Sequence, residues 1–274
     1  MEVFAERWLF DFLIYLYALS LLFSFSDLLY PNLRSRRLSA GLLITVWFCQ
    51  SLLFILWIFS LIPIALQFDA LFMYSWALVT FTLVIQRLYQ RMDLFVFFAN
   101  VIGFTVLAIH LFFARDLSPE YTKLLLSELG FVHISLAILS YVSFSLSSIC
   151  AGLYLISNYL LKKKKWNKFL FRLPSLDRLQ VFSRYLVLIG TPLLLIAMIL
   201  GVIWYYQMIG QLFWNDVKVW TSSLVMIVYG FVLYQWVVNR WNGRRLAWWN
   251  TIALVSILLN VLISSTRISF HHWF

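Results

Sequence analysis

Eight apolar stretches separated by short polar segments run through the chain and constrain its fold more than any other feature. The hydrocarbon core of a membrane is about 30 Å thick and a helix rises about 1.5 Å per residue, so one crossing needs roughly 20 apolar residues. The third stretch is short and the fifth is long. The sequence predicts eight transmembrane helices over Trp8–Phe25, Gly41–Leu66, Ala70–Gln86, Leu94–Ala114, Gly130–Leu161, Tyr185–Tyr206, Val219–Val238 and Leu246–Thr266.

The composition excludes a soluble enzyme with a membrane anchor. Of 274 residues, 63% are hydrophobic and 12% are charged, whereas soluble domains have about 45–50% and about 25%. We therefore expect an all-α, polytopic integral membrane protein whose residues 1–274 form a single bundle. The first stretch is expected to be retained, because Glu2 and Glu6 stand where a cleavable signal carries basic residues. Cys49 and Cys150 lie within apolar stretches, which favours buried thiols over a disulfide.

Basic residues gather between alternate pairs of these stretches. Cytoplasmic loops of membrane proteins accumulate Lys and Arg, and sixteen of the 21 basic residues follow the first, third, fifth and seventh stretches. Both termini are therefore expected outside. The net charge of +10 then reflects topology and contact with anionic membrane lipid rather than nucleic-acid binding. The four basic segments are Arg34–Arg37, Arg87–Arg91, Lys162–Arg184 and Arg240–Arg245.

All four histidines fall on the predicted outer side. His110 is near the outer end of the fourth stretch, His133 opens the fifth, and His271 and His272 lie in the tail. Neutral imidazole is the commonest axial ligand of haem iron, and aromatic-rich helix ends can supply a flat apolar slot. Histidines and tryptophans also suit the headgroup depth of any membrane. The residues alone leave both interpretations open.

An aromatic-rich segment separates the sixth and seventh stretches. It contains Trp214, Asp216 and Trp220, and aromatic residues alternate there with a few polar ones. Such a segment can cover a flat apolar ligand, or it can form an ordinary aromatic belt at the membrane surface. Neither interpretation is excluded by the spacing.

Three segments resemble a known superfamily in the same order along the chain. His133–Tyr141 reads H-I-S-L-A-I-L-S-Y, which resembles the H-V-S-x-x-x-L-S-Y span of the cytochrome c assembly proteins, the superfamily of CcsA, ResC and CcmC. Trp214 and Asp216–Lys218 stand where those proteins carry a W-D-P-K loop. Trp241–Trp248 is similar to their G-W-R-G-R-R-A-A segment, and Leu258–Leu262 is similar to N-L-L-G.

Within that superfamily the chain most resembles the HemX family, a reduced form with eight spans. Ala70–Ala77, Phe97–Phe104 and the ending Phe270–Phe274 carry this resemblance. The sequence departs from the wider superfamily pattern, whose dense tryptophan motif is reduced here to Trp214 and Trp220. Val217 replaces the proline of W-D-P-K, and Arg267 stands where the second external histidine is expected.

The resemblance implies a non-covalent haem b site at the outer face, held by two histidines. His133 matches the first external histidine, and His271 is the expected second ligand, since a shift of four residues returns to the same helix face. Arg267 could bind a haem propionate through its guanidinium, or extend to the membrane surface. The implied site consists of His133, His271, the substitute His272, the reserve ligand His110, and Trp214, Asp216, Trp220 and Arg267.

The resemblance to the HemX family also implies a regulatory role in the plasma membrane of a Gram-positive bacterium. Such a protein lowers the abundance of glutamyl-tRNA reductase, the first committed enzyme of haem biosynthesis, and the expected cytoplasmic surface is Lys162–Arg184. The alternatives are presentation of haem for c-type cytochrome assembly and haem export. The sequence contains no Walker A lysine, H-E-x-x-H helix or G-x-S-x-G elbow, so we expect no enzymatic activity.

Overall fold

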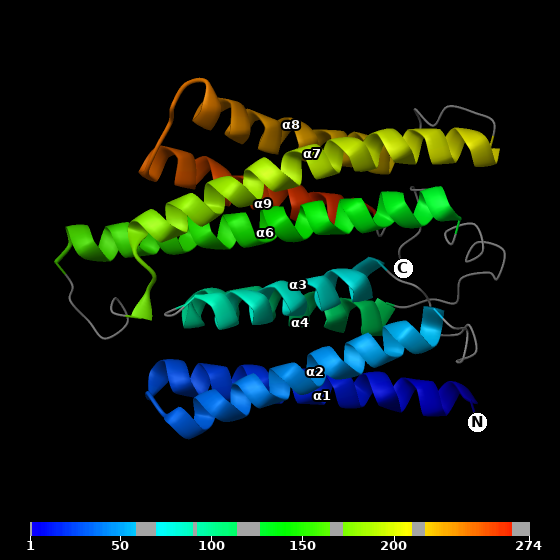
Figure 1. The fold of residues 1–274 in the computed structure, drawn as a ribbon, viewed down its shortest axis with the longest axis horizontal. Coiled ribbons are helices and arrows are strands. Elements are labelled where there is room, and N and C mark those ends of the chain that lie inside the picture. Colours follow the sequence, from blue (N-terminus) through cyan, green and yellow to red (C-terminus); the bar gives the residue numbers. More distant parts are fainter. Residues whose placement is uncertain are drawn as a thin grey trace. The chain divides into compact units, whose positions relative to one another are not determined.

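The computed structural model describes residues 2–58, 70–89, 92–113, 127–164, 172–209 and 217–264. Within these ranges the chain forms eight long α-helices and no strand (Figure 1). They are α1 (Glu2–Leu29), α2 (Leu33–Ile58), α3 (Ala70–Leu88), α4 (Asp93–Phe113), α6 (Glu128–Lys162), α7 (Leu176–Ile209), α8 (Val217–Val237) and α9 (Arg244–Ser264).

The expectation of an all-helical membrane protein is confirmed. Seven of the described helices, α1 to α4 and α6 to α8, are long and apolar enough to cross a membrane. The eighth, α9, has 21 residues but includes Arg244, Arg245 and Asn250, so the count of eight spans stays a prediction, as does the location of the termini. The long fifth and short third stretches correspond to helices of 35 and 19 residues. The prediction of one domain over residues 1–274 also stays a prediction.

The helix boundaries differ most from the predicted ones at α7. This helix begins at Leu176, whereas the apolar stretch begins at Tyr185. The additional turns contain Asp177, an acidic residue in the first turn, which favours a helix start because the helix N-terminus carries partial positive charge. Polar residues extend a transmembrane helix into the water phase, so a search for apolar residues alone misses them.

The chain divides into two compact units, Met1–Thr122 and Lys123–Phe274, and each is described by itself. In the first unit, α1 packs on α2 and α4, and α3 packs on the same two helices. Its buried core includes Leu13, Tyr17, Val46 and Leu107. Tyr17 Oη of α1 donates a hydrogen bond of 2.8 Å to Asn100 Oδ1 of α4, and this bond joins the two helices. Cys49 and Cys150 are both free thiols, and Cys150 is buried as the sequence predicted, whereas Cys49 of α2 is half-buried.

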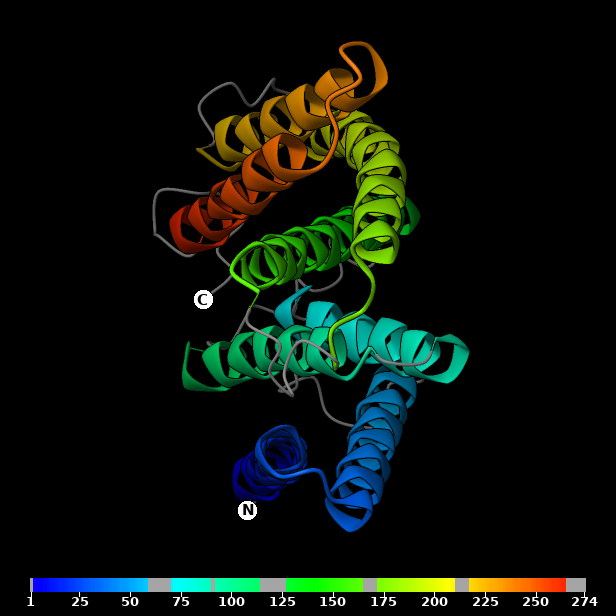
Figure 2. The ribbon, with the colours of Figure 1, turned by 90° about the vertical axis from the view of Figure 1, so that its left-hand side faces the viewer.

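The second unit is a four-helix bundle. Figure 2 shows α6, α7, α8 and α9 grouped around one core, and each packs on its two neighbours in the order α6, α7, α8, α9 and back to α6. α6 also meets the diagonally opposite α8, because the Phe144 ring stacks on the Tyr229 ring at a centroid distance of 3.8 Å. Ser148 Oγ lies 3.0 Å from Tyr229 Oη in the same layer.

A ladder of hydrogen bonds joins α6 to the antiparallel α7. Its rungs recur every seven residues on both helices, which is the repeat of helices that wrap around each other. In each rung a side chain of α6 reaches a backbone carbonyl oxygen of α7. The rungs are His133 Nδ1 to Ala197 at 2.6 Å, Ser140 Oγ to Gly190 at 2.9 Å, and Ser147 Oγ to Ser183 at 2.7 Å.

Asn250 ties α9 to the same ladder. Its Nδ2 donates to Ser147 Oγ at 2.6 Å and to Ser183 Oγ at 2.7 Å, while Ser148 Oγ donates to the Asn250 backbone carbonyl at 2.9 Å. Hydrogen bonds between membrane helices contribute about 0.6 kcal/mol each on average. The network therefore stabilises the bundle modestly, and it fixes the register of α6, α7 and α9 because each partner is reached at one height only.

Candidate functional site

His133 lies in the second turn of α6 and is half-buried against α7. Its Nδ1 lies 2.6 Å from the carbonyl oxygen of Ala197. A carbonyl oxygen only accepts hydrogen bonds, so Nδ1 must carry the proton. In a neutral imidazole the lone pair that binds metals is then on Nε2. The contact with α7 thus selects the tautomer that a histidine needs in order to bind iron through Nε2.

The imidazole ring of His133 lies directly on the backbone of α7 at Gly201. A Cβ atom at Gly201 would be 2.5 Å from Cε1 and 2.8 Å from Nδ1 of His133. Both distances are far below a van der Waals contact. Only glycine at this position therefore admits the ring in its present orientation, and α7 fixes both the hydrogen bond and the plane of the imidazole.

A second contact joins the same ends of α6 and α7. Ser127 is the N-cap of α6, and its hydroxyl accepts a hydrogen bond of 3.3 Å from the Gly130 backbone N–H. Trp204 of α7, whose side chain is almost fully buried, donates from Nε1 to the same hydroxyl at 2.7 Å. The first two turns of α6 are thus attached to α7 at two points, which restricts the movement of His133.

A polar cluster lies about two helical turns along α6 from His133. Asn260 of α9 donates from Nδ2 to Tyr141 Oη at 3.2 Å and to Ser222 Oγ of α8 at 3.1 Å. Tyr141 lies in the segment His133–Tyr141 and Asn260 in Leu258–Leu262, two of the segments that resemble the superfamily motifs. Because the cluster joins α6, α8 and α9, these motif residues hold the helices beneath the His133 end of the bundle.

The remaining predicted site residues fall into three groups. Trp220 of α8 is 62% exposed and lies at the end of the second unit where α8 begins and α9 ends. His110 of α4 belongs to the first unit, where it is 5% exposed. The centroid of its ring lies 5.7 Å from that of Phe10 and 6.2 Å from that of Phe72. Trp214, Asp216, Arg267, His271 and His272 lie outside the described residues.

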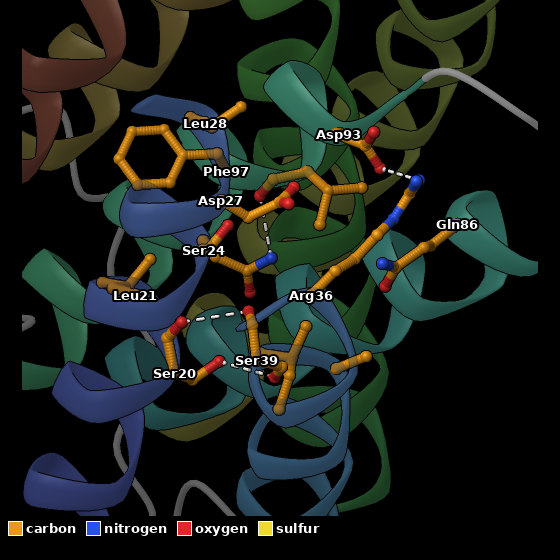
Figure 3. Close-up of a pocket in the computed structure, with 14 residues that line it drawn as sticks. Ser20, Leu21, Ser24, Asp27, Leu28, Arg36, Ser39, Gln86, Asp93 and Phe97 are labelled. Atoms are coloured by element: carbon orange, nitrogen blue, oxygen red, sulfur yellow. Dashed lines mark hydrogen bonds and ion pairs between the residues drawn. The ribbon is translucent and has the colours of Figure 1, made fainter. Parts of the chain in front are cut away.

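The first unit contains a separate polar pocket among α1, α2, α3 and α4 (Figure 3). The Arg36 guanidinium pairs with the Asp93 carboxylate at 2.6 Å, and Asp27 accepts a hydrogen bond of 3.0 Å from the Asn32 backbone N–H. None of the lining residues is His, Cys, Met or Tyr, the side chains that usually bind haem iron. The pocket therefore offers no side chain of the kind that binds haem iron, and the imidazole on α6 remains the better candidate site for haem.

The sequence interpretation found His133 but missed its partners on α7. Ala197, Gly201 and Trp204 belong to an apolar stretch without any chemical motif. One signal was available, because Ser183, Gly190 and Ala197 recur at the same seven-residue spacing as His133, Ser140 and Ser147. Small residues at helical spacing commonly mark the contact face of a membrane helix.

Comparison with known proteins supports the resemblance of the motifs. The family model described as "Cytochrome C assembly protein" matches residues 45–272. The chain is 40% identical over 264 residues to Protein HemX of Bacillus subtilis (strain 168), which covers 95% of each chain. It is 39% identical over 269 residues to Protein HemX of Brevibacillus brevis, which covers 97% of this chain and 98% of that protein.

A solved structure has a similar fold. The chain matches Cytochrome c Heme Lyase CcmF with a TM-score of 0.63 and 16% sequence identity, over 92% of this chain. The match covers 45% of CcmF, so the chain spans about half the length of that protein. Seven apolar helices together with these relatives identify a multi-pass protein of the bacterial plasma membrane. The chain belongs to the cytochrome c assembly protein family and is a member of its HemX type.

Proposed function

We propose that the protein binds haem b non-covalently at the end of the second unit where α6 begins, with His133 as an axial ligand. The observation that carries this proposal is the hydrogen bond between His133 Nδ1 and the Ala197 carbonyl oxygen. Histidines that bind metals almost always donate their other ring N–H to a carbonyl, a carboxylate or water. Haem supplies an iron that accepts the Nε2 lone pair, and the surrounding helix ends supply apolar surface.

The proposed second ligand is His271, with His272 as its substitute. Trp214, Asp216 and Trp220 would then cover the porphyrin, and Arg267 would bind a propionate. Support comes from the chain's path, because α7 and α9 both end, and α8 begins, toward the end of the unit that holds His133. His110 remains the reserve ligand, although its ring would first have to leave its contacts with Phe10 and Phe72.

Haem binding is tested on the purified full-length protein. We expect the wild type to take up added haemin and to show a Soret band that shifts on reduction. His133→Ala should retain less than about a tenth of this binding, because outer-sphere partners alone change metal affinity by 10–100-fold and the loss of a ligand costs more. Gly152→Ala on α6 is the control, since a Cβ there meets no atom within 4 Å. A wild-type protein that takes up no haemin contradicts the proposal.

We further propose that the protein is not an enzyme and that it lowers the abundance of glutamyl-tRNA reductase when haem is plentiful. This role requires a link between the haem site and a surface on the other side of the membrane. The rungs of the α6–α7 ladder extend from His133 toward the exposed Lys162, Lys163 and Lys164 at the opposite end of α6. Haem would act by binding one arrangement of these helices more tightly than another.

Regulation is tested by measuring the reductase level in cells across a range of haem supply. We expect cells that lack the protein, and cells that carry His133→Ala, to keep a high reductase level when haem is added. Cells with the wild type or with Gly152→Ala should lower it. A reductase level that responds to haem equally in all four strains contradicts the regulatory role, while leaving haem binding to be judged by its own measurement.

The second candidate function is the handling of haem for assembly of c-type cytochromes. The family match and the CcmF-like fold favour it. The sequence departs from the superfamily where such a role would use the W-D-P-K loop, because Val217 replaces the proline. Unchanged reductase levels together with a loss of covalent haem on c-type cytochromes in the deletion strain would favour this function over regulation.

A further inference from the structure

We propose that the Ala197 carbonyl makes the His133 site select ferric over ferrous haem, with Ala197 and Gly201 as positioning residues. This inference rests on the proposed function. The Nδ1 to oxygen distance of 2.6 Å is shorter than the usual N–H···O distance of about 2.9 Å. A strong hydrogen bond from Nδ1–H raises the electron density on Nε2. A more electron-rich nitrogen favours Fe(III) over Fe(II), since hydrogen bonding to an axial ligand is one of the means by which proteins set haem potentials.

The structure holds the imidazole so that this hydrogen bond persists. Gly201 lies one helical turn after Ala197 on α7, and the ring fills the space that a side chain would occupy. The ring is therefore confined on the side that lies against α7. The Trp204 to Ser127 hydrogen bond of 2.7 Å keeps the two helix ends at a constant separation. Binding of haem would thus find the imidazole already oriented and in the required tautomer.

A purely structural role for His133 makes a different prediction. Ser140 and Ser147 form the equivalent rungs with the carbonyl oxygens of Gly190 and Ser183. A serine at position 133 would be enough if the rung were needed only to join α6 to α7. His133→Ser therefore keeps a hydroxyl donor on α6 and removes the ring nitrogen that would face the iron. It separates the two roles better than alanine does.

The test of the redox preference uses two small ligands in the cavity of His133→Gly. 4-Methylimidazole has the shape of the missing side chain and carries an N–H that can reach the Ala197 carbonyl. 1-Methylimidazole can place its methyl group in the same position, but it presents a C–H to that oxygen. Both have a ring nitrogen for iron. The full-length variant, loaded with haemin and either ligand, is titrated with dithionite while the absorption spectrum is recorded.

We expect both ligands to restore haem binding and to differ in the ratio of ferric to ferrous affinity. With 1-methylimidazole this ratio should fall about tenfold, which raises the one-electron midpoint potential by about 59 mV. Wild-type protein should match 4-methylimidazole. Equal potentials with the two ligands overturn the inference, because the hydrogen bond to Ala197 would then not influence the iron.

A measurement without haem distinguishes failure of the inference from failure of the proposed function. Nitrogen-15 NMR of histidine-labelled, full-length apo-protein reports which ring nitrogen carries the proton, and the His133→Ser spectrum identifies the His133 signals. We expect a protonated Nδ1 and an unprotonated Nε2. Haemin uptake by a protein whose His133 has the opposite tautomer overturns this inference alone. The expected tautomer without haemin uptake overturns the proposed function, and with it the redox preference.

Discussion

Gly201→Ala is expected to lower haemin affinity by about 10–100-fold, as removal of second-shell support for a metal ligand commonly does, while leaving the fold intact. The added Cβ would lie 2.5 Å from Cε1 of His133, so either the ring or the helix must move. An imidazole at the end of its side chain moves more easily than a helix backbone. The ring should therefore leave the Ala197 carbonyl, and the affinity should fall because both its orientation and its preferred tautomer are lost.

The measurement is a haemin titration of purified Gly201→Ala, followed by its thermal melting in the same detergent. Gly230→Ala on α8 is the matched control, because a Cβ there meets no atom within 4 Å. The control should bind like the wild type. If Gly201→Ala bound haemin with wild-type affinity, the contact between the His133 ring and α7 would not contribute to haemin binding. A large drop in melting temperature would instead mean that the backbone moved and the ring did not.

The fold was largely predictable because the membrane reduces the possible structures to a few. Hydrocarbon offers no partner for a backbone N–H or C=O, so an apolar stretch of sufficient length must be helical. Length and polarity therefore located α1 to α4 and α6 to α9. They failed at the ends of helices, as at Leu176, because there the polar side chains are solvated and carry no apolar signal.

Only one half of the candidate site could be predicted from the sequence. Imidazole chemistry and the segment His133–Tyr141 pointed to His133, because few side chains bind iron and histidine is rare in a membrane span. The other half consists of a backbone carbonyl at Ala197 and the bare Cα of Gly201. Neither has side-chain chemistry that a sequence can display. What the sequence does display is the spacing of small residues, and this acquires meaning only once α6 and α7 are known to be antiparallel partners.

Gly190→Leu is expected to have the largest effect on stability, because α7 meets the core of the second unit at this residue. A Cβ at Gly190 would lie 2.6 Å from Cε1 of Phe144, whose ring is fully buried and stacked on Tyr229 at 3.8 Å. This ring cannot move aside as an exposed side chain would. Overpacking of a filled core costs about 1–3 kcal/mol. Separation of the helices would also break the hydrogen bond from Ser140 Oγ to the Gly190 carbonyl, which contributes about 0.6 kcal/mol more.

The free thiol of Cys150 reports the opening of this bundle, because it is fully buried on α6, two turns from Phe144. In a Cys49→Ala background, a fluorogenic maleimide should label Cys150 of Gly190→Leu many times faster than in the parent protein, and at a lower temperature. Gly152→Ala on α6 should label at nearly the parent rate, since a Cβ at that position meets no atom within 4 Å. Equal rates in both variants would mean that the Phe144 layer accommodates a side chain. The hydrogen-bond ladder would then not require glycine at position 190. Close packing at this residue would no longer support a rigid connection from His133 to the far end of α6.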